Sequence, residues 1–338
     1  MRSDRNKTGR RQVLKGIGAG LATLTVSPIF AKPHFASTTQ KTFNVNGIED
    51  TTRKYPRPPF KSQSQSWPGL ASKMDPRPDH GEKTYKGTGR LAGRKALITG
   101  GDSGMGRAAA IAYAREGADV AINYYPSEEP DAQEVIALIK AEGRKAVAIP
   151  GDLRDESFCR KLVDEAIKGL GGLDILVNNA ARQQNRASIL DISNDDFDST
   201  MKTNIYAPFW IIKAALPHMQ PGSVIIGTTS EQAYDPSPDL YDYAQTKAAT
   251  MNYVKSLAKQ LASKGIRVNG VAPGPIWTPL QVSGGTTQEK LQKFGARTPF
   301  GRPGQPVELA SIYVQLAADD ASFATGQIYG SSGGAGQP

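Results

Sequence analysis

Tyr243 and Lys247 stand four residues apart at the start of a stretch with helical periodicity. On a helix this spacing is one turn, so the two side chains share a face. A free phenol has a pKa of about 10 and is a poor base near neutrality. A neighbouring ammonium favours the phenolate, so we expect Lys247 to lower the pKa of Tyr243. The pair is a candidate for proton transfer, although this spacing by itself more often marks a surface pair.

Polar residues near other predicted elements are expected to lie close to Tyr243 and Lys247, which favours a functional role for the pair. Ser230 lies thirteen residues before Tyr243, after the predicted strand 223–228, and Asn204 lies in the predicted helix 195–219. The segments 178–180 (NNA) and 273–278 (PGPIWT) follow two further predicted strands. The carboxyl ends of parallel strands meet at one edge of a sheet, so we expect all these residues to lie together.

The elements that must position these residues alternate along the chain from Arg90 onward. Short β-branched apolar runs predict strands over 95–99, 118–124, 145–150, 173–178, 223–228, 266–272 and 327–329. Longer amphipathic runs predict helices over 105–116, 128–142, 155–169, 195–219, 241–263 and 306–318. Buried strands separated by helices indicate an α/β protein with a doubly wound parallel sheet, Rossmann-like, in a single domain.

A glycine-rich turn, TGGDSGMG over 99–106, joins the first predicted strand to the first predicted helix. Gly100 permits a tight turn, Gly104 lets the backbone approach a pyrophosphate, and Gly106 lets the helix pack close to the sheet. The start of the helix supplies free N–H groups and a partial positive charge. The turn therefore predicts a dinucleotide site, with a plain strand–helix turn as the alternative.

The sequence leaves the choice between NAD and NADP open. The end of the second strand, 123–127, reads NYYPS and holds neither an acid for a ribose hydroxyl nor a cation for a 2′-phosphate. Arg107 is nearby but lies just inside the helix, with a solvated helix residue as the alternative to a role in this choice. Glu128 and Glu129 are interpreted as acids that suit the start of a helix. Asp152, after the third strand, is placed to meet the adenine edge.

With these motifs in this order, residues 91–338 resemble the short-chain dehydrogenase/reductase family, near its glucose/ribitol-dehydrogenase-like bacterial members. The resemblance implies that Tyr243 is the general acid/base, that Lys247 holds the nicotinamide ribose and depresses the pKa of Tyr243, and that Ser230 binds the substrate oxygen. It also implies that Asn204 holds a water linking Lys247 to solvent. Ala181 departs from the family, which commonly has glycine there. The predicted dinucleotide contacts are Gly100, Ser103, Gly104, Met105, Gly106, Asp152, Asn179, Tyr243, Lys247, Pro273, Gly274, Ile276 and Thr278.

The expected activity is reversible hydride transfer between a nicotinamide cofactor, NAD or NADP, and a carbonyl or secondary alcohol. The substrate is a small molecule such as an aldehyde, a ketone or a sugar. Two alternatives stay open: a non-catalytic dinucleotide-binding sensor or scaffold, and an epimerase or dehydratase on the same fold. The resemblance further implies a homotetramer or a dimer.

Composition excludes other classes of function. Residues 1–90 carry 17 Lys and Arg against six Asp and Glu, whereas residues 91–338 carry 24 against 26. The basic excess is therefore confined to the N-terminal segment, and nucleic acid is not expected as a partner. The chain has one cysteine, Cys159, and three scattered histidines, so we expect no metal site.

The N-terminal segment has two parts by composition. Arg10 and Arg11 precede the apolar run 16–31, and residues 1–36 resemble a twin-arginine export signal, with a cytoplasmic protein as the alternative. The apolar run is too short to span a bilayer comfortably, so we expect no stable membrane anchor. The resemblance to an export signal predicts a periplasmic or exported protein. Residues 37–90 are rich in proline and polar residues and predict an extended arm before the catalytic domain 91–338, with a disordered linker as the alternative.

Overall fold

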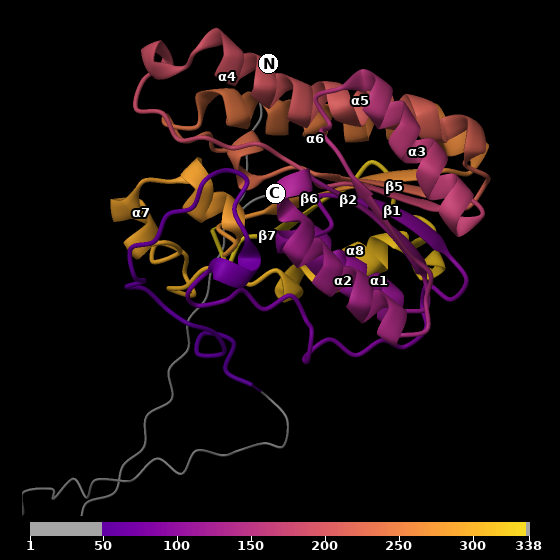
Figure 1. The fold of residues 1–338 in the computed structure, drawn as a ribbon, viewed down its shortest axis with the longest axis horizontal. Coiled ribbons are helices and arrows are strands. Elements are labelled where there is room, and N and C mark those ends of the chain that lie inside the picture. Colours follow the sequence, from indigo (N-terminus) through magenta and orange to yellow (C-terminus); the bar gives the residue numbers. More distant parts are fainter. Residues whose placement is uncertain (1–48, 336–338) are drawn as a thin grey trace, which may run out of the picture. The chain divides into compact units, whose positions relative to one another are not determined.

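Seven parallel strands form one sheet at the centre of the molecule (Figure 1), and the computed structural model describes residues 49–335. The order across the sheet is β3-β2-β1-β4-β5-β6-β7. Chain order therefore reverses between β1 and β4, and in such sheets the crevice beyond this point is where ligands bind. The strands are β1 (Lys95–Thr99), β2 (Asp119–Tyr124), β3 (Ala146–Pro150), β4 (Ile175–Asn178), β5 (Val224–Thr228), β6 (Arg267–Pro273) and β7 (Ile328–Ser331).

Helices cover both faces of the sheet (Figure 1). One face carries α1 (Gly104–Arg115), α2 (Glu129–Ala141) and α8 (Val307–Ala317). The other carries α3 (Glu156–Leu170), α5 (Ala207–Ala215) and α6 (Tyr241–Leu261). Alternate residues of one strand serve the two faces: Ile98 belongs to the core under α1 and α8, and Leu97 to the core under α3 and α5. Burial on both faces explains why the strands read as continuous apolar runs.

The predicted doubly wound parallel sheet is confirmed, and each predicted strand lies within three residues of an observed one. The prediction of one continuous α-helix over 195–219 is wrong. It consists of α4 (Asn194–Met201), a wider π-helical turn (Lys202–Tyr206), α5 and a short 3-10 turn (Leu216–His218). A further short helix, α7 (Gln288–Gln292), lies in a stretch where no helix was predicted. The predicted export signal falls outside the described residues.

Residues 49–90 contain only one short 3-10 turn, Ala71–Lys73, and pack against the sheet domain. Phe60 stacks on Trp277 with ring centroids 4.4 Å apart, and Trp277 Nε1 donates a hydrogen bond to the Pro76 carbonyl at 2.8 Å. Trp277 is fully buried, in a small cluster with Phe60 and Leu291. Its ring therefore holds the N-terminal segment and does not face a substrate.

We expect Trp277→Ala to lower the free energy of unfolding by about 3–5 kcal/mol, the usual cost of truncating a buried aromatic. The loss of both the Phe60 stack and the Pro76 hydrogen bond should loosen residues 60–76, which limited proteolysis would detect. Phe323→Ala is the matched control, because Phe323 is fully exposed. Equal stability of the two variants in urea denaturation would contradict this packing.

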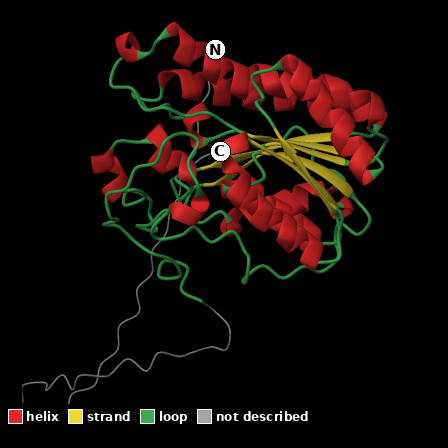
Figure 2. Cartoon of the chain, viewed as in Figure 1, coloured by secondary structure: helices red, strands yellow, loops and turns green. Residues whose placement is uncertain are grey.

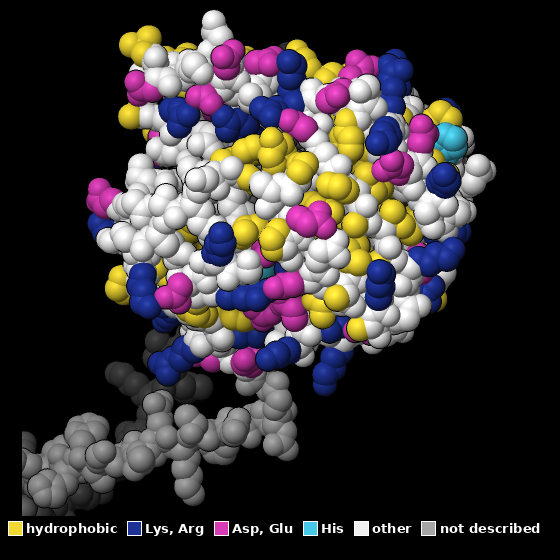
Figure 3. Space-filling model, in the orientation of Figure 1, with side chains coloured by type: hydrophobic (Ala, Val, Ile, Leu, Met, Phe, Trp, Pro, Cys, Tyr) yellow, Lys and Arg dark blue, Asp and Glu magenta, His cyan; other side chains and the backbone are white. Residues whose placement is uncertain are grey.

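One face of the molecule carries charged side chains of both signs. On the face shown in Figure 3, Lys and Arg are interspersed with Asp and Glu. No helix among residues 49–335 is long and apolar enough to cross a membrane. The same residues contain no group of three or more His, Cys, Asp or Glu placed to hold a metal ion.

Candidate active site

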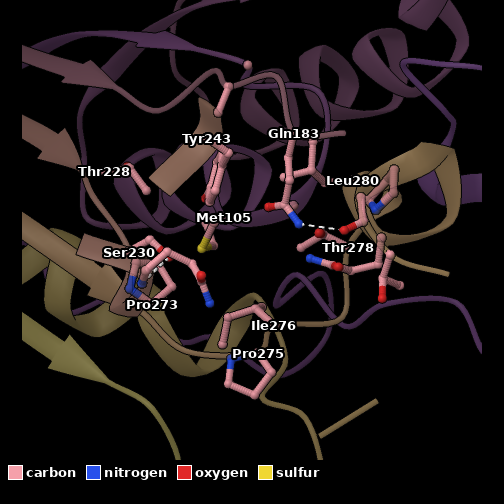
Figure 4. A pocket seen from close by; sticks show the side chains of 18 of the residues that line it. Met105, Gln183, Thr228, Ser230, Tyr243, Pro273, Pro275, Ile276, Thr278 and Leu280 are labelled. Carbon is pink, nitrogen blue, oxygen red and sulfur yellow. Dashed lines mark hydrogen bonds between the residues drawn. The ribbon is translucent and has the colours of Figure 1, made fainter. Parts of the chain in front are cut away.

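A cavity of about 610 Å³ lies at the carboxyl ends of the strands, where Figure 2 shows the loops gathered at one end of the sheet. This volume suits a cofactor or drug-sized ligand. Figure 4 shows Tyr243, Ser230 and Met105 around this cavity, with Thr278 and Leu280 on another wall. Of the predicted site residues, Gly106 and Asn204 do not line it. Those that do are Gly100, Ser103, Gly104, Met105, Asp152, Asn179, Ser230, Tyr243, Lys247, Pro273, Gly274, Ile276 and Thr278.

The glycine-rich turn has the shape of a phosphate cradle. Gly100 and Gly104 have φ values of 62° and 51°, in the left-handed region that favours glycine. The side chain of Asn179 donates hydrogen bonds to the carbonyls of Thr99 and Gly100, at 3.2 and 3.1 Å, and so fixes the turn. A Cβ on Gly104 would lie 3.3 Å from Thr278 and narrow the cavity. A dinucleotide pyrophosphate fits this place, over the start of α1.

Gly106 acts from behind the cavity wall. A Cβ at this position would lie 1.9 Å from the Gly100 carbonyl oxygen and 2.6 Å from Asn179 Nδ2. Only glycine therefore lets α1 approach the turn this closely, as the sequence predicted.

Tyr243 and Ser230 lie together in the cavity wall, each 7% exposed. Ser230 follows β5, and its Oγ accepts a hydrogen bond from the Gln232 N–H at 3.2 Å. Burial raises the pKa of Tyr243 above its ordinary value, and a hydrogen bond with Ser230 acts in the opposite direction. The prediction that Lys247 lowers this pKa is therefore wrong for the chain alone, because desolvation outweighs the other influences.

Lys247 lies one turn beyond Tyr243 on α6 and is 4% exposed. Its Nζ donates a hydrogen bond to the Thr228 carbonyl at 2.8 Å and lies 5.4 Å from the centroid of the Tyr243 ring. No carboxylate lies within ion-pair distance of this ammonium in the described part of the chain. Burial lowers the pKa of Lys247 to about 7, so the amine can change charge near neutrality.

This lowered pKa gives a testable dependence of stability on pH. Between pH 7 and about 10 the unfolded chain holds the lysine proton while the folded chain releases it, so this group makes unfolding harder as pH rises. We expect the free energy of unfolding to gain more between pH 7.5 and pH 9.5 in the wild type than in Lys247→Met. Urea denaturation at the two pH values measures both gains. Equal gains would mean that Lys247 keeps an ordinary pKa in the fold.

Asn204 lies in the π-helical turn and reaches toward α6. Its Nδ2 donates to the Arg182 carbonyl at 2.9 Å and to Thr246 Oγ1 at 3.0 Å, and its Oδ1 accepts from the Arg182 N–H at 2.8 Å. Thr246 directly precedes Lys247, so Asn204 links α6 to the loop that follows β4. These contacts make it a positioning residue, and the predicted water beside Lys247 stays a prediction.

Several cavity residues were not predicted. Trp67 and Pro68 come from the N-terminal segment, and the Trp67 ring lies 5.1 Å from that of Tyr125. Asp102 and Glu128 also line the cavity, 1% and 8% exposed. The interpretation of Glu128 as only a helix-opening acid was therefore incomplete. The run of acids at 128–131 was the available signal, but periodicity does not tell which of them turns inward.

Arg107 is not the solvated helix residue that the sequence allowed as an alternative. It is 1% exposed rather than solvated, because its guanidinium pairs with Glu82 and Glu134, at 3.0 and 2.8 Å. Asp152 lines the cavity as predicted, and its carboxylate already pairs with Arg154 at 2.6 Å.

The wall beyond Tyr243 is rich in hydrogen-bonding groups. Gln183 is buried there and donates to the Gly285 carbonyl at 2.8 Å. Glu231, directly after Ser230, lines the same wall, and burial together with repulsion from Asp235 raises the pKa of Glu231 to about 7. A substrate in this part of the cavity would meet polar groups of both donor and acceptor type.

Known proteins match this chain in sequence and in fold. Residues 100–335 match the family model described as enoyl-(acyl carrier protein) reductase. A short-chain dehydrogenase of Burkholderia cenocepacia J2315, solved in complex with NADP, is 36% identical, with a TM-score of 0.68 over 72% of this chain and 98% of that one. The chain belongs to the short-chain dehydrogenase/reductase family. As a member of this family it is an NAD(P)-dependent oxidoreductase.

Two curated relatives are more similar in sequence. The uncharacterized oxidoreductase YhxD of Bacillus subtilis is 59% identical, over 81% of this chain and 93% of its own length. The glucose and ribitol dehydrogenase of Daucus carota is 43% identical, over 82% of this chain and 96% of its own length. The predicted resemblance to this family is confirmed.

Proposed function

We propose that Tyr243, Lys247 and Ser230 interconvert a small carbonyl compound and its alcohol beside a bound nicotinamide ring. One observation carries this proposal: the three side chains line the cavity that also contains the glycine-rich turn. A bound nicotinamide dinucleotide supplies or accepts the hydride. The protein supplies position, hydrogen bonds and a proton.

Each residue has a distinct task. Tyr243 gives a proton to the substrate oxygen in reduction and takes it back in oxidation. Ser230 donates a hydrogen bond to the same oxygen as negative charge develops on it. Lys247 holds the nicotinamide ribose hydroxyls with its Nζ. The remaining predicted dinucleotide contacts, from Gly100 to Thr278, support the cofactor along the cavity, except Gly106, which acts through the packing of α1.

The substrate class that suits the cavity is a hydroxylated aldehyde, ketone or sugar. Support comes from Gln183 and Glu231, which offer hydrogen bonds beyond Tyr243, and from the name of the Daucus carota relative. An apolar carbonyl compound would remove water from the Glu231 carboxyl group without replacing its hydrogen bonds, at a cost in free energy.

An absorbance assay tests this function. The purified chain is incubated with NADH or NADPH and a panel of aldehydes, ketones and sugars, and loss of the nicotinamide band is followed. We expect turnover with at least one hydroxylated carbonyl compound, and about 10²–10³-fold lower turnover in Ser230→Ala. Tight dinucleotide binding without turnover across the panel would favour the sensor or scaffold.

Export and self-association complete the proposal. Arg10 and Arg11 with the apolar run 16–31 support twin-arginine export to the periplasm, which cell fractionation tests. Association as a dimer or tetramer through α5 and neighbouring elements is supported by Tyr206 and Phe209, which are 47% and 60% exposed. Light scattering measures the oligomeric state.

A further inference from the structure

We propose that the chain selects NAD over NADP, and that Asp102 and Glu128 make the selection by binding the adenosine ribose. The inference rests on the dinucleotide site proposed above and names a specificity that the sequence left open. It concerns the far end of the cavity from Tyr243, where the turn after β1 meets the end of β2.

Both carboxyl groups stand where the adenosine ribose belongs. In a doubly wound sheet with phosphates over the first helix, this ribose lies beside the end of the second strand. Asp102 is part of the glycine-rich turn itself, and Glu128 ends the short 3-10 turn after β2. The two acids, Asn123 and Tyr124 all line the cavity. The sequence pattern points to residues 123–127 for this role, and neither acid lies in that segment.

The two carboxyl groups are buried and incompletely paired. Asp102 Oδ2 has no hydrogen-bond partner among the described residues, although the side chain is only 1% exposed. Glu128 Oε2 accepts the Tyr125 N–H at 2.9 Å. Burial raises the pKa of both groups, and repulsion from Asp102 raises the pKa of Glu128 further, so the two lie within electrostatic reach of each other. A buried acceptor without a partner is costly unless a ligand satisfies it, and a ribose hydroxyl can donate to it.

Arg107, the cation on α1 near these acids, already donates hydrogen bonds to other groups. Arg107 Nε donates to Glu82 at 3.1 Å, Nη2 to Glu134 at 2.8 Å, and Nη1 to the Asp131 carbonyl at 3.4 Å. The guanidinium is 1% exposed and lines no part of the cavity. It is therefore held by carboxylates and has no free face for a phosphate.

Among residues 49–335, no other cation replaces Arg107 at this end of the cavity. Arg154 pairs with Asp152 through two nitrogens, Nε and Nη2. The lysines and arginine that line the cavity, Lys247, Lys290, Lys293 and Arg297, come from α6 and from the segment after β6. A 2′-phosphate would thus enter a place with two carboxyl groups and no available positive charge.

NAD and NADP differ at this place in one group, a 2′-hydroxyl in NAD and a 2′-phosphate in NADP, and this difference determines which one binds more tightly. A 2′-hydroxyl donates a hydrogen bond to a carboxylate, whereas a phosphate has only acceptor oxygens and a charge near −2. With its pKa raised to about 9, Glu128 is largely protonated near neutrality, whereas Asp102, with a pKa of about 7, carries a negative charge. Repulsion between that charge and the phosphate in a partly buried site corresponds to a loss of affinity of about 100-fold or more. We therefore expect NADP⁺ to bind at least about 100-fold more weakly than NAD⁺.

Equilibrium titration of the purified full chain with NAD⁺ and NADP⁺, by calorimetry, tests the proposal. In Asp102→Asn/Glu128→Gln the ratio of the two dissociation constants should fall to about tenfold or less, mainly through tighter NADP⁺ binding. Glu129→Gln is the matched control, because Glu129 adjoins Glu128 but does not line the cavity, and it should keep the wild-type ratio.

Each outcome has a separate meaning. Equal affinity of the wild type for both dinucleotides overturns the selection, and this result needs no variant to fold. A wild-type preference for NAD⁺ that the double variant retains overturns the role of the two acids, provided that its circular dichroism and melting match the wild type. If neither dinucleotide binds the wild type, the proposed dinucleotide site itself fails.

Discussion

Replacing Tyr243 with phenylalanine is expected to lower turnover by about 10²–10⁴-fold, the usual contribution of a positioned acid or base. The substitution removes the phenolic oxygen and leaves the ring, so α6 and the 7% exposed site should keep their packing. The dissociation constant of the dinucleotide should therefore change by no more than about twofold. Steady-state kinetics and equilibrium titration measure the two quantities.

Tyr241→Phe is the matched control for this prediction. Tyr241 begins the same helix, two residues earlier, but is 46% exposed and lies outside the cavity lining. We expect it to keep wild-type turnover. Unchanged turnover in Tyr243→Phe would remove the tyrosine from the chemistry, and equal losses in both variants would point to damage to α6.

Gly106→Ala is expected to weaken dinucleotide binding by about tenfold or more and to cost about 1–3 kcal/mol of unfolding free energy. The added Cβ would overlap the Gly100 carbonyl oxygen at 1.9 Å, so α1 must move away from the turn. Moving the start of α1 also moves the N–H groups that are placed to receive the pyrophosphate. Titration with NAD⁺ and urea denaturation follow the two effects.

The control for this steric argument is Gly143→Ala. Gly143 has a φ of 72°, and a Cβ there would meet no atom within 4 Å. It should cost about 1–2 kcal/mol through backbone strain alone and leave dinucleotide binding unchanged. Wild-type affinity and stability in Gly106→Ala would show that α1 can approach the turn without glycine.

The sequence could predict the sheet because each strand is buried on both faces and each connecting helix is amphipathic. The same local signals placed Tyr243, Ser230 and the glycine-rich turn at one sheet edge. The break in the helix 195–219 could not be predicted, because Asn204 makes its contacts with Arg182 and Thr246, which lie far from it in sequence. Apolar periodicity carries no record of such contacts.

The missed cavity residues share a similar cause. Trp67 lies in a segment without helices or strands. The sequence therefore has no helical or strand periodicity there from which the direction of this side chain could be predicted. Asp102 and Glu128 lie in turns, where the side chain that points inward depends on backbone angles and not on spacing. The pKa of Tyr243 was predicted from one neighbouring charge, whereas burial of the phenol dominates.

The most direct test of the central claim is the fate of the hydride. The chain is given NADH that carries deuterium at the transferred position of C4, together with a carbonyl substrate found in the panel, and the alcohol is examined by mass spectrometry. We predict that the alcohol carries the deuterium on its former carbonyl carbon, and that Tyr243→Phe forms it at a rate at least about 100-fold lower. Alcohol formed without deuterium, or at the same rate by Tyr243→Phe, would contradict hydride transfer assisted by this tyrosine.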